Sequence, residues 1–139
     1  MIDEYFTALK AHIEAGSGLG GRVYDTVRTG AEGLIRDNYV ILYSPNPVNM
    51  PQERFTGVQT FADTVEFDCD LRVVGVSPQA VRLTLGRVHA QLAGHLLTVT
   101  GRQPAKVTTE GGGRIREDQS VKNFLYYADL TAEWVSRPL

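Results

Sequence analysis

This sequence is poor in the residue types and runs that mark cross-linked or membrane proteins. Cys69 is the only cysteine among 139 residues, so no disulfide can form within the chain. It lies on the apolar side of an alternating segment, where we expect a buried, unreactive thiol. No apolar run of about 18 or more residues occurs, so we expect no transmembrane helix and no membrane partner. The acidic start, residues 1–4, lacks the features of a signal peptide and indicates a protein of a reducing compartment.

The chain also lacks an excess of basic residues. It carries 14 Lys and Arg against 16 Asp and Glu, which gives a formal charge of −2. A protein that binds duplex DNA needs a basic footprint, so we expect no specific contact with DNA. The length predicts one domain over residues 1–139. A domain of this size buries roughly two-thirds of its unfolded surface, so it needs no bound metal or disulfide to be stable.

Signatures of cofactors and catalysis are missing as well. Residues 16–21 fit the pattern G-x-G-x-x-G. A dinucleotide fingerprint leaves a strand and opens a helix, whereas these glycines leave a predicted helix, so they indicate a helix end and a turn. Ser17, Ser44 and Ser136 lack the sequence context of a hydrolase nucleophile. We therefore expect no enzyme activity, no catalytic residue and no cofactor.

The histidines predict no metal site. His89 and His95 lie six residues apart in one predicted helix, which places them on opposite sides of it, so they cannot hold the same ion. His12 belongs to another predicted element, and Cys69 has no partner at metal-ligand spacing. We expect solvated or interface histidines and no bound metal.

The most informative segment begins as a strict alternation. The odd-numbered residues from Val65 to Val73 are apolar, which predicts a half-buried strand within residues 61–74. The even-numbered positions on its other face are mostly charged: Glu66, Asp68, Asp70 and Arg72. Three carboxylates in a row could bind a cation or support acid–base chemistry. A solvated or intersubunit face is favoured, because no nucleophile or pocket is indicated nearby.

The apolar period then changes from two to between three and four. Ser77 and Pro78 suit the N-cap and the first position of a helix. An apolar stripe predicts that this helix covers residues 78–97, with Gly94 near its end. The same pattern predicts a first helix over residues 3–15.

Other segments have the composition of strands. Residues 22–24 and 105–109 favour short strands, and residues 38–43, which are apolar on both sides, favour a central strand. Residues 124–135 alternate and predict a second long strand. The prolines of residues 44–58 indicate a long irregular connection.

The remaining segments indicate loops. Residues 25–36 are polar, and residues 111–118 combine three glycines with mixed charge. We therefore expect an α+β fold, a small mixed, mostly antiparallel sheet of about four to five strands with two helices packed on one face. The two long strands pair antiparallel in this fold, and the other face meets water or a neighbouring subunit.

The order of these features resembles a known family. A short helix leads to the R-V-Y run at residues 22–24, and Y-V-I-L-Y at residues 39–43 is followed by a proline-bearing loop. A strand, the second helix, a glycine-rich loop and a final aromatic strand complete the order. Over nearly all of its length the chain resembles the tail terminator proteins of long-tailed bacteriophages, also called tail-completion or tail-to-head joining proteins.

This resemblance implies a structural virion protein of the tail or neck region, present in the host cytoplasm during assembly. Such a protein forms a ring of about six copies on the tail tube by head-to-tail contacts. The ring stops tube polymerisation and presents a surface to the head. The implied partners are further copies of the chain, the major tail tube protein and the head-side connector or stopper protein. DNA passes through the channel without specific binding.

A ring of this kind needs two unlike surfaces on each copy. We expect subunit or tube contacts at charged residues of the long strand and of two connecting segments: Glu66, Asp68, Asp70, Arg72, Arg54, Arg114, Arg116, Glu117 and Asp118. An acidic lumen would repel DNA phosphates and ease their passage. We also predict that the loop of residues 109–121 becomes ordered only on contact with the tail tube or connector.

Other functions stay open on the sequence alone. A head-side connector, a stopper ring or a minor tail protein belongs to the same neck assembly, and co-purification with tail tubes rather than filled heads separates a terminator from these. A small enzyme would need a pocket with perturbed titratable groups, which the sequence does not indicate. A small intracellular ligand- or peptide-binding α+β module is the third alternative. A sharp monomer peak at high concentration would favour these last two.

Overall fold

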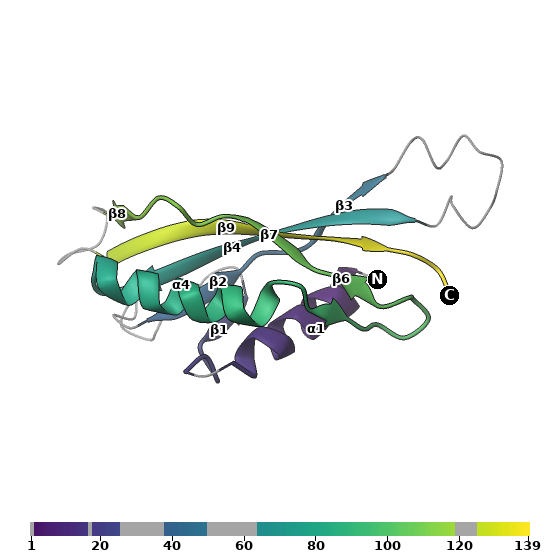
Figure 1. Cartoon of the computed structure of the whole chain (residues 1–139), viewed down its shortest axis with the longest axis horizontal. Helices are drawn as coiled ribbons and strands as arrows, with labels where there is room; N and C mark the ends of the chain where they lie inside the picture. Colours follow the sequence, from purple (N-terminus) through teal and green to yellow (C-terminus); the bar gives the residue numbers. More distant parts are fainter. Residues whose placement is uncertain (1, 17, 26–37, 50–63, 119–124) are drawn as a thin grey trace.

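The computed structural model describes residues 2–16, 18–25, 38–49, 64–118 and 125–139. They form two layers, a sheet and a pair of helices on one of its faces (Figure 1). Helix α1 spans Ile2–Glu14, and helix α4 spans Pro78–Leu92. Neither of these described helices is long and apolar enough to cross a membrane. The α+β class expected from the sequence is confirmed.

The sheet is mixed but mostly antiparallel. Its strands follow the order β1-β2-β4-β9-β7, in which β1 and β2 are parallel and the other neighbours antiparallel. Their bounds are Val23–Asp25 (β1), Tyr39–Leu42 (β2), Val65–Gly75 (β4), Leu125–Ser136 (β9) and Thr108–Gly111 (β7). Two short strands extend this sheet: β3 (Asn46–Asn49) pairs with β4, and β8 (Arg116–Asp118) pairs with β9. Strands β5 (Leu96–Leu97) and β6 (Ala105–Lys106) pair with each other in a separate sheet.

The two long strands form the centre of the sheet, as the sequence predicts. β4 and β9 pair antiparallel from Val65 opposite Ser136 to Gly75 opposite Tyr126. β2 lies between β1 and β4, which confirms its expected central position. The apolar residues of β4 face the helices and its charged residues face away, because successive side chains of a strand point to opposite faces.

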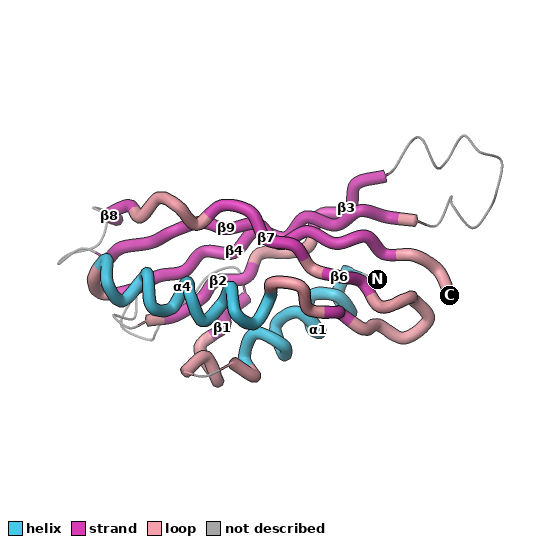
Figure 2. The backbone as a smooth tube through the Cα atoms, viewed as in Figure 1, coloured by secondary structure: helices cyan, strands magenta, loops and turns pink. Residues whose placement is uncertain are grey.

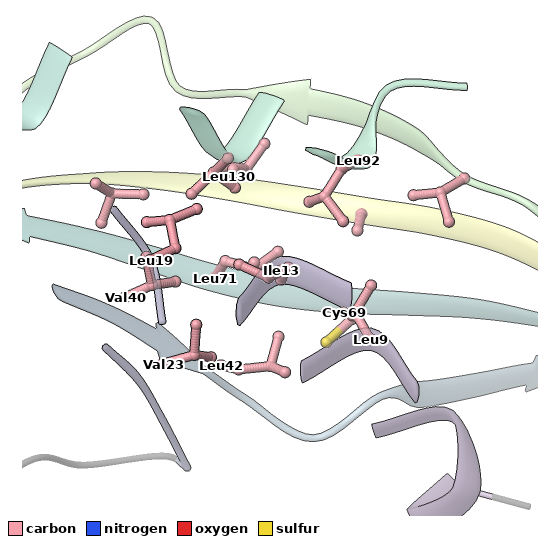
Figure 3. Packing of buried hydrophobic residues seen from close by; sticks show 14 of the residues in the cluster. Leu9, Ile13, Leu19, Val23, Val40, Leu42, Cys69, Leu71, Leu92 and Leu130 are labelled. Atoms are coloured by element: carbon pink, nitrogen blue, oxygen red, sulfur yellow. The ribbon is translucent and has the colours of Figure 1, made fainter. Parts of the chain in front are cut away.

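The core lies between the helices and the sheet. Figure 3 shows Ile13 of α1 and Leu92 of α4 beside Leu71 and Leu130 of the two long strands, all within one buried cluster. Cys69 belongs to the same cluster, and burial raises the pKa of its thiol to about 12. The thiol therefore stays protonated at neutral pH, and the expected burial of this cysteine is confirmed.

Helix α4 begins as predicted but ends early. The Ser77 hydroxyl accepts a hydrogen bond from the Ala80 N–H at 3.1 Å, and Pro78 opens the helix. The prediction of a helix to residue 97 is wrong, because α4 ends at Leu92. Gly94 then adopts a φ of +72°, a left-handed conformation that stops helices. The chain turns there into β5.

This early end changes the positions of the histidines. The prediction that His89 and His95 occupy opposite sides of one helix is wrong, because His95 follows α4. Its ring stacks on that of His12 in α1, with ring centroids 3.4 Å apart and planes 7° apart. The Gln91 side chain also donates a hydrogen bond to the His12 carbonyl at 3.0 Å. Desolvation, with a smaller effect of His12, lowers the pKa of His95.

The predicted irregular connection over residues 44–58 contains a strand. β3 pairs with β4 in spite of Pro47. A proline lacks an N–H to donate, so a strand tolerates it where that side needs no ladder partner. Residues 50–58 lie outside the described residues, as do residues 26–36 of the other expected loop.

The predicted mobile loop near residues 109–121 is also partly strand (Figure 2). β7 reaches Gly111, and β8 pairs residues 116–118 with the start of β9. That the segment becomes ordered only on contact stays a prediction, whereas the expected loop is wrong for the residues of β7 and β8. The reason is the length of β9, which offers free ladder groups beyond the end of β7. Residues 119–121 lie outside the described part of the chain.

Candidate assembly surface

The face of the sheet opposite the helices carries most of the charged residues expected at contacts. Cross-strand partners in antiparallel pairs share a face, so the register arranges the side chains in rows. The charge changes along these rows, from acidic at one end through an ion pair to aromatic residues and arginine at the other. The rows are Glu66–Val135, Asp68–Glu133–Thr108, Asp70–Thr131–Glu110, Ile41–Arg72–Asp129 and Tyr39–Val74–Tyr127–Arg116.

We call Glu66, Asp68, Glu110 and Glu133 the acidic zone. Carboxylate oxygens of Glu66, Asp68 and Glu133 lie within 4.8 Å of one another. Among the described residues, no Lys, Arg or His forms an ion pair with any member of the zone. Oxygens at this spacing are ligands that Ca²⁺ or Mg²⁺ accepts. The set differs from the one weighed on the sequence, because Glu133 takes the place of Asp70.

The negative charge of the acidic zone affects the pKa of Glu133. Desolvation raises the pKa of this carboxyl, and the neighbouring Glu110 and Asp68 raise it further. Like charges close together disfavour the ionised form, and Lys106 and Arg137, which line one hollow with Glu66 and Glu133, form no ion pair with either carboxylate.

We expect Glu133→Gln to raise the stability of the fold at neutral pH. A raised pKa means that the folded chain binds this proton more readily than the unfolded chain. The destabilising charge is therefore absent below the ordinary value of 4.5 and develops as the pH rises through the folded value. The gain stays below about 1 kcal/mol, because solvent and salt screen a half-exposed group.

Urea unfolding of Glu133→Gln and the parent chain at pH 7 and near pH 3.5 measures this difference. Glu117→Gln is the matched control, because Glu117 is exposed and pairs with Tyr126 on the other face of the sheet. A gain for Glu133→Gln that is equal at both pH values would show that charge repulsion is not its cause.

Arg72 is engaged within its own chain at the centre of the face. Its Nε and Nη2 donate to the two carboxylate oxygens of Asp129, at 2.8 and 3.2 Å. This pairing raises the pKa of Arg72, and the guanidinium lies 4.1 Å from the centroid of the Tyr127 ring. Asp70 is also engaged, because the Thr131 hydroxyl donates to its Oδ1 at 2.9 Å. These two predicted contact residues therefore have less capacity for a partner than the acidic zone.

The opposite end of the face ends in a hollow of about 570 Å³. We call it the arginine hollow, and it is lined by Gly111, Gly112, Gly113, Arg114, Arg116, Tyr127 and Asp129. Within the part of the chain that is described, neither Arg114 nor Arg116 has an ion-pair partner. Gly111 and Gly112 have φ values of +95° and +82°, a conformation that suits residues without a side chain. The two guanidinium groups give the hollow the donors to receive an anionic group.

A cluster of apolar side chains lies beside the arginine hollow. Tyr39, Val74 and Leu125 form a small buried cluster that is separate from the main core. Tyr24 packs at its margin, with its ring edge toward Tyr39 and the ring centroids 6.0 Å apart. The arginine hollow thus lies beside this aromatic cluster, whereas Glu66 and Glu133 line a separate hollow with Lys106, Arg137 and apolar side chains.

The structure separates the other predicted contact residues. Alternation along β8 places Arg116 and Asp118 on the outer face and Glu117 on the side of the helices. Glu117 therefore lies on the other side of the sheet from Arg116. Arg54 lies outside the described residues.

The sequence alone does not predict which residues of β9 lie opposite the charged residues of β4. Glu133 stands on the polar side of the last strand, which the alternation shows, but its position opposite Asp68 depends on the register of two distant strands. Asp129 is likewise brought to Arg72 by that register. No local signal in the sequence contains this information.

Comparison with known proteins finds a shared fold. No family model and no curated protein sequence matches this chain. A chain from the solved virion of a native gene transfer agent (GTA) particle superimposes with a TM-score of 0.70. The superposition covers 97% of this chain and 96% of the other, and the two sequences are 17% identical. At that identity the likeness shows a common fold.

Proposed function

We propose that this chain is a structural protein of a virion, which forms a ring on the end of a tail tube. The observation that carries the proposal is the fold shared with a chain of the GTA virion over 97% of the present chain. The resemblance of the sequence to tail terminator proteins supports the finer role. In that role the ring stops tube polymerisation and joins the tail to the head-side connector.

The outer face suits such a role. A closed ring uses head-to-tail contacts, in which one patch of each copy meets a different patch of the next. The acidic zone and the arginine hollow are two such patches, of opposite sign and at different places on one face. The chain has a net charge of −2, so a channel through the ring would repel DNA phosphates and let DNA pass without being retained.

The tail tube protein of the same virus provides the test. Added to polymerising tubes, the chain is expected to shorten them, because a ring on the growing end removes the binding site for the next tube subunit. Negative-stain micrographs should show extra density with a central hole at one tube end. The heat-unfolded chain is the control.

Two other results would overturn the proposal. Unchanged tube length together with binding to filled heads would assign the chain to the head-side connector instead. A chain that binds neither tubes nor heads would remove the virion role altogether.

A further inference from the structure

The acidic zone and the arginine hollow cannot neutralise each other within one copy of the chain. Arg116 pairs with Tyr127 of β9, and Asp68 pairs with Glu133 of the same strand. Six residues of strand separate Tyr127 from Glu133, a distance of roughly 20 Å at about 3.3 Å per residue. This exceeds the Debye length at physiological salt, so the two charges are largely screened from each other.

Resting on the proposed function, we infer that the acidic zone of one copy receives Arg114 and Arg116 of the next copy. Charge complementarity carries this inference. Among the described residues, the four carboxylates of the acidic zone have no ion-pair partner, and neither have the two guanidinium groups of the arginine hollow. A head-to-tail contact between the two unlike patches repeats from copy to copy and can close into a ring, whereas a reciprocal two-fold contact would stop at a dimer, which light scattering tells apart.

The chemistry of both patches suits this pairing. A guanidinium presents paired N–H donors that match a carboxylate, and such charge-assisted bonds are stronger than neutral ones. A Cβ at Gly113, next to Arg114, would meet nothing within 4 Å, so a second chain can approach the backbone closely there. The partly buried ring of Tyr127 would be covered in the same contact.

The roles of the two patches differ from those of Arg72 and Asp129. That ion pair is already closed within one copy, so it gains little from a neighbour. The acidic zone gains more, because an incoming arginine relieves the repulsion among its carboxylates. The contact is therefore expected to weaken as salt concentration rises.

Charge reversal on each patch tests the contact. The first variant combines Glu66→Lys, Asp68→Lys and Glu133→Lys, and the second combines Arg114→Glu and Arg116→Glu. In the first variant both patches are positive, and in the second both are negative, so copies of either variant repel each other at the contact. We therefore expect the self-association of each variant to be at least about 100-fold weaker than that of the parent chain. An equimolar mixture is expected to recover association, because every contact between alternating variants again joins opposite charges.

Light scattering after size exclusion, at low salt, measures these assemblies. General attraction between oppositely charged proteins is excluded by a matched control, Lys10→Glu with Arg82→Glu, which has the same charge change as the arginine variant but on the helices. This control should associate as the parent chain does. Mixed with the first variant, it can accept that variant's intact arginines at one contact only, because its own arginines repel the reversed zone, so assemblies of alternating copies should not form. Circular dichroism confirms that each variant is folded.

Several outcomes overturn the contact. A parent chain that stays monomeric up to about 1 mM shows that copies do not meet in this way. Undiminished association of either variant, or a mixture that stays apart, excludes these patches as partners. Binding of a duplex oligonucleotide that is lost in the arginine variant would assign the hollow to phosphate. The tube-capping experiment is independent of all these results, so the proposed function can stand where this contact fails.

Discussion

Replacement of Trp134 by alanine is expected to lower the free energy of unfolding by about 3–5 kcal/mol, as large-to-small changes in well-packed cores do. Trp134 is only 2% exposed and lies on the helix side of β9. Its ring stacks on Phe67 of β4, with centroids 5.5 Å apart and planes 15° apart, and contacts Tyr5 of α1 at 5.6 Å. The three rings join the sheet to the first helix, so truncation leaves a cavity where the two layers meet.

Trp134→Phe separates the packing of this side chain from its polar atom. The indole Nε1 is buried and has no hydrogen-bond partner among the described residues. An unsatisfied buried donor is itself unfavourable, so phenylalanine should cost less than half as much as alanine. Trp134 is the only tryptophan, so urea unfolding is followed by far-UV circular dichroism rather than by fluorescence. A loss below about 1 kcal/mol for the alanine variant would contradict the core assignment.

Periodicity alone predicts the parts of this fold whose two sides have different surroundings. β4 and β9 each have one face in the core, so their apolar residues must alternate, and the sequence shows this directly. The start of α4 is equally local, because Ser77 and Pro78 act on the helix that follows them. Its end was harder to predict. Leu96 continues the apolar stripe, but Gly94 lets the chain leave the helix first.

Periodicity does not predict the short strands at the edges of the sheet. β3 and β8 are short and pair with only part of a longer strand, so their own residues carry little alternation. Pro47 and the glycines near Arg114 are typical of loops, and the sequence therefore indicates loops. What makes these segments strands is the free edge of β4 and of β9, which lies far away in the sequence.

The candidate assembly surface can likewise be predicted only where it depends on a single strand. The charged face of β4 is evident from the sequence, because it depends on alternation within one strand. Its division into an acidic zone, a closed ion pair and an arginine hollow depends on which residues of β9 lie opposite. A shift of the register by two residues would keep every side chain on its face and would still move Glu133 away from Asp68.

Gly75→Val is the second substitution with a large expected effect, a loss of about 1–3 kcal/mol, the range for an overpacked core. Gly75 is buried at the end of β4, where the chain turns into α4. A Cβ there would lie 3.0 Å from the backbone nitrogen of Val81 and 3.2 Å from the Cβ of Ala80. These atoms belong to the first turn of α4, which the Ser77 cap holds in place, so the helix must shift to make room.

Gly86→Ala is the matched control within the same helix. Gly86 is exposed in the middle of α4, and a Cβ there meets nothing within 4 Å. Alanine should therefore stabilise the fold by about 0.5–1 kcal/mol, because glycine weakens a helix interior. Opposite signs for the two variants in urea unfolding would show that the junction of β4 and α4 is close-packed. If Gly75→Val unfolds at the urea concentration of the parent chain, α4 can move away from the sheet at this junction without loss of stability.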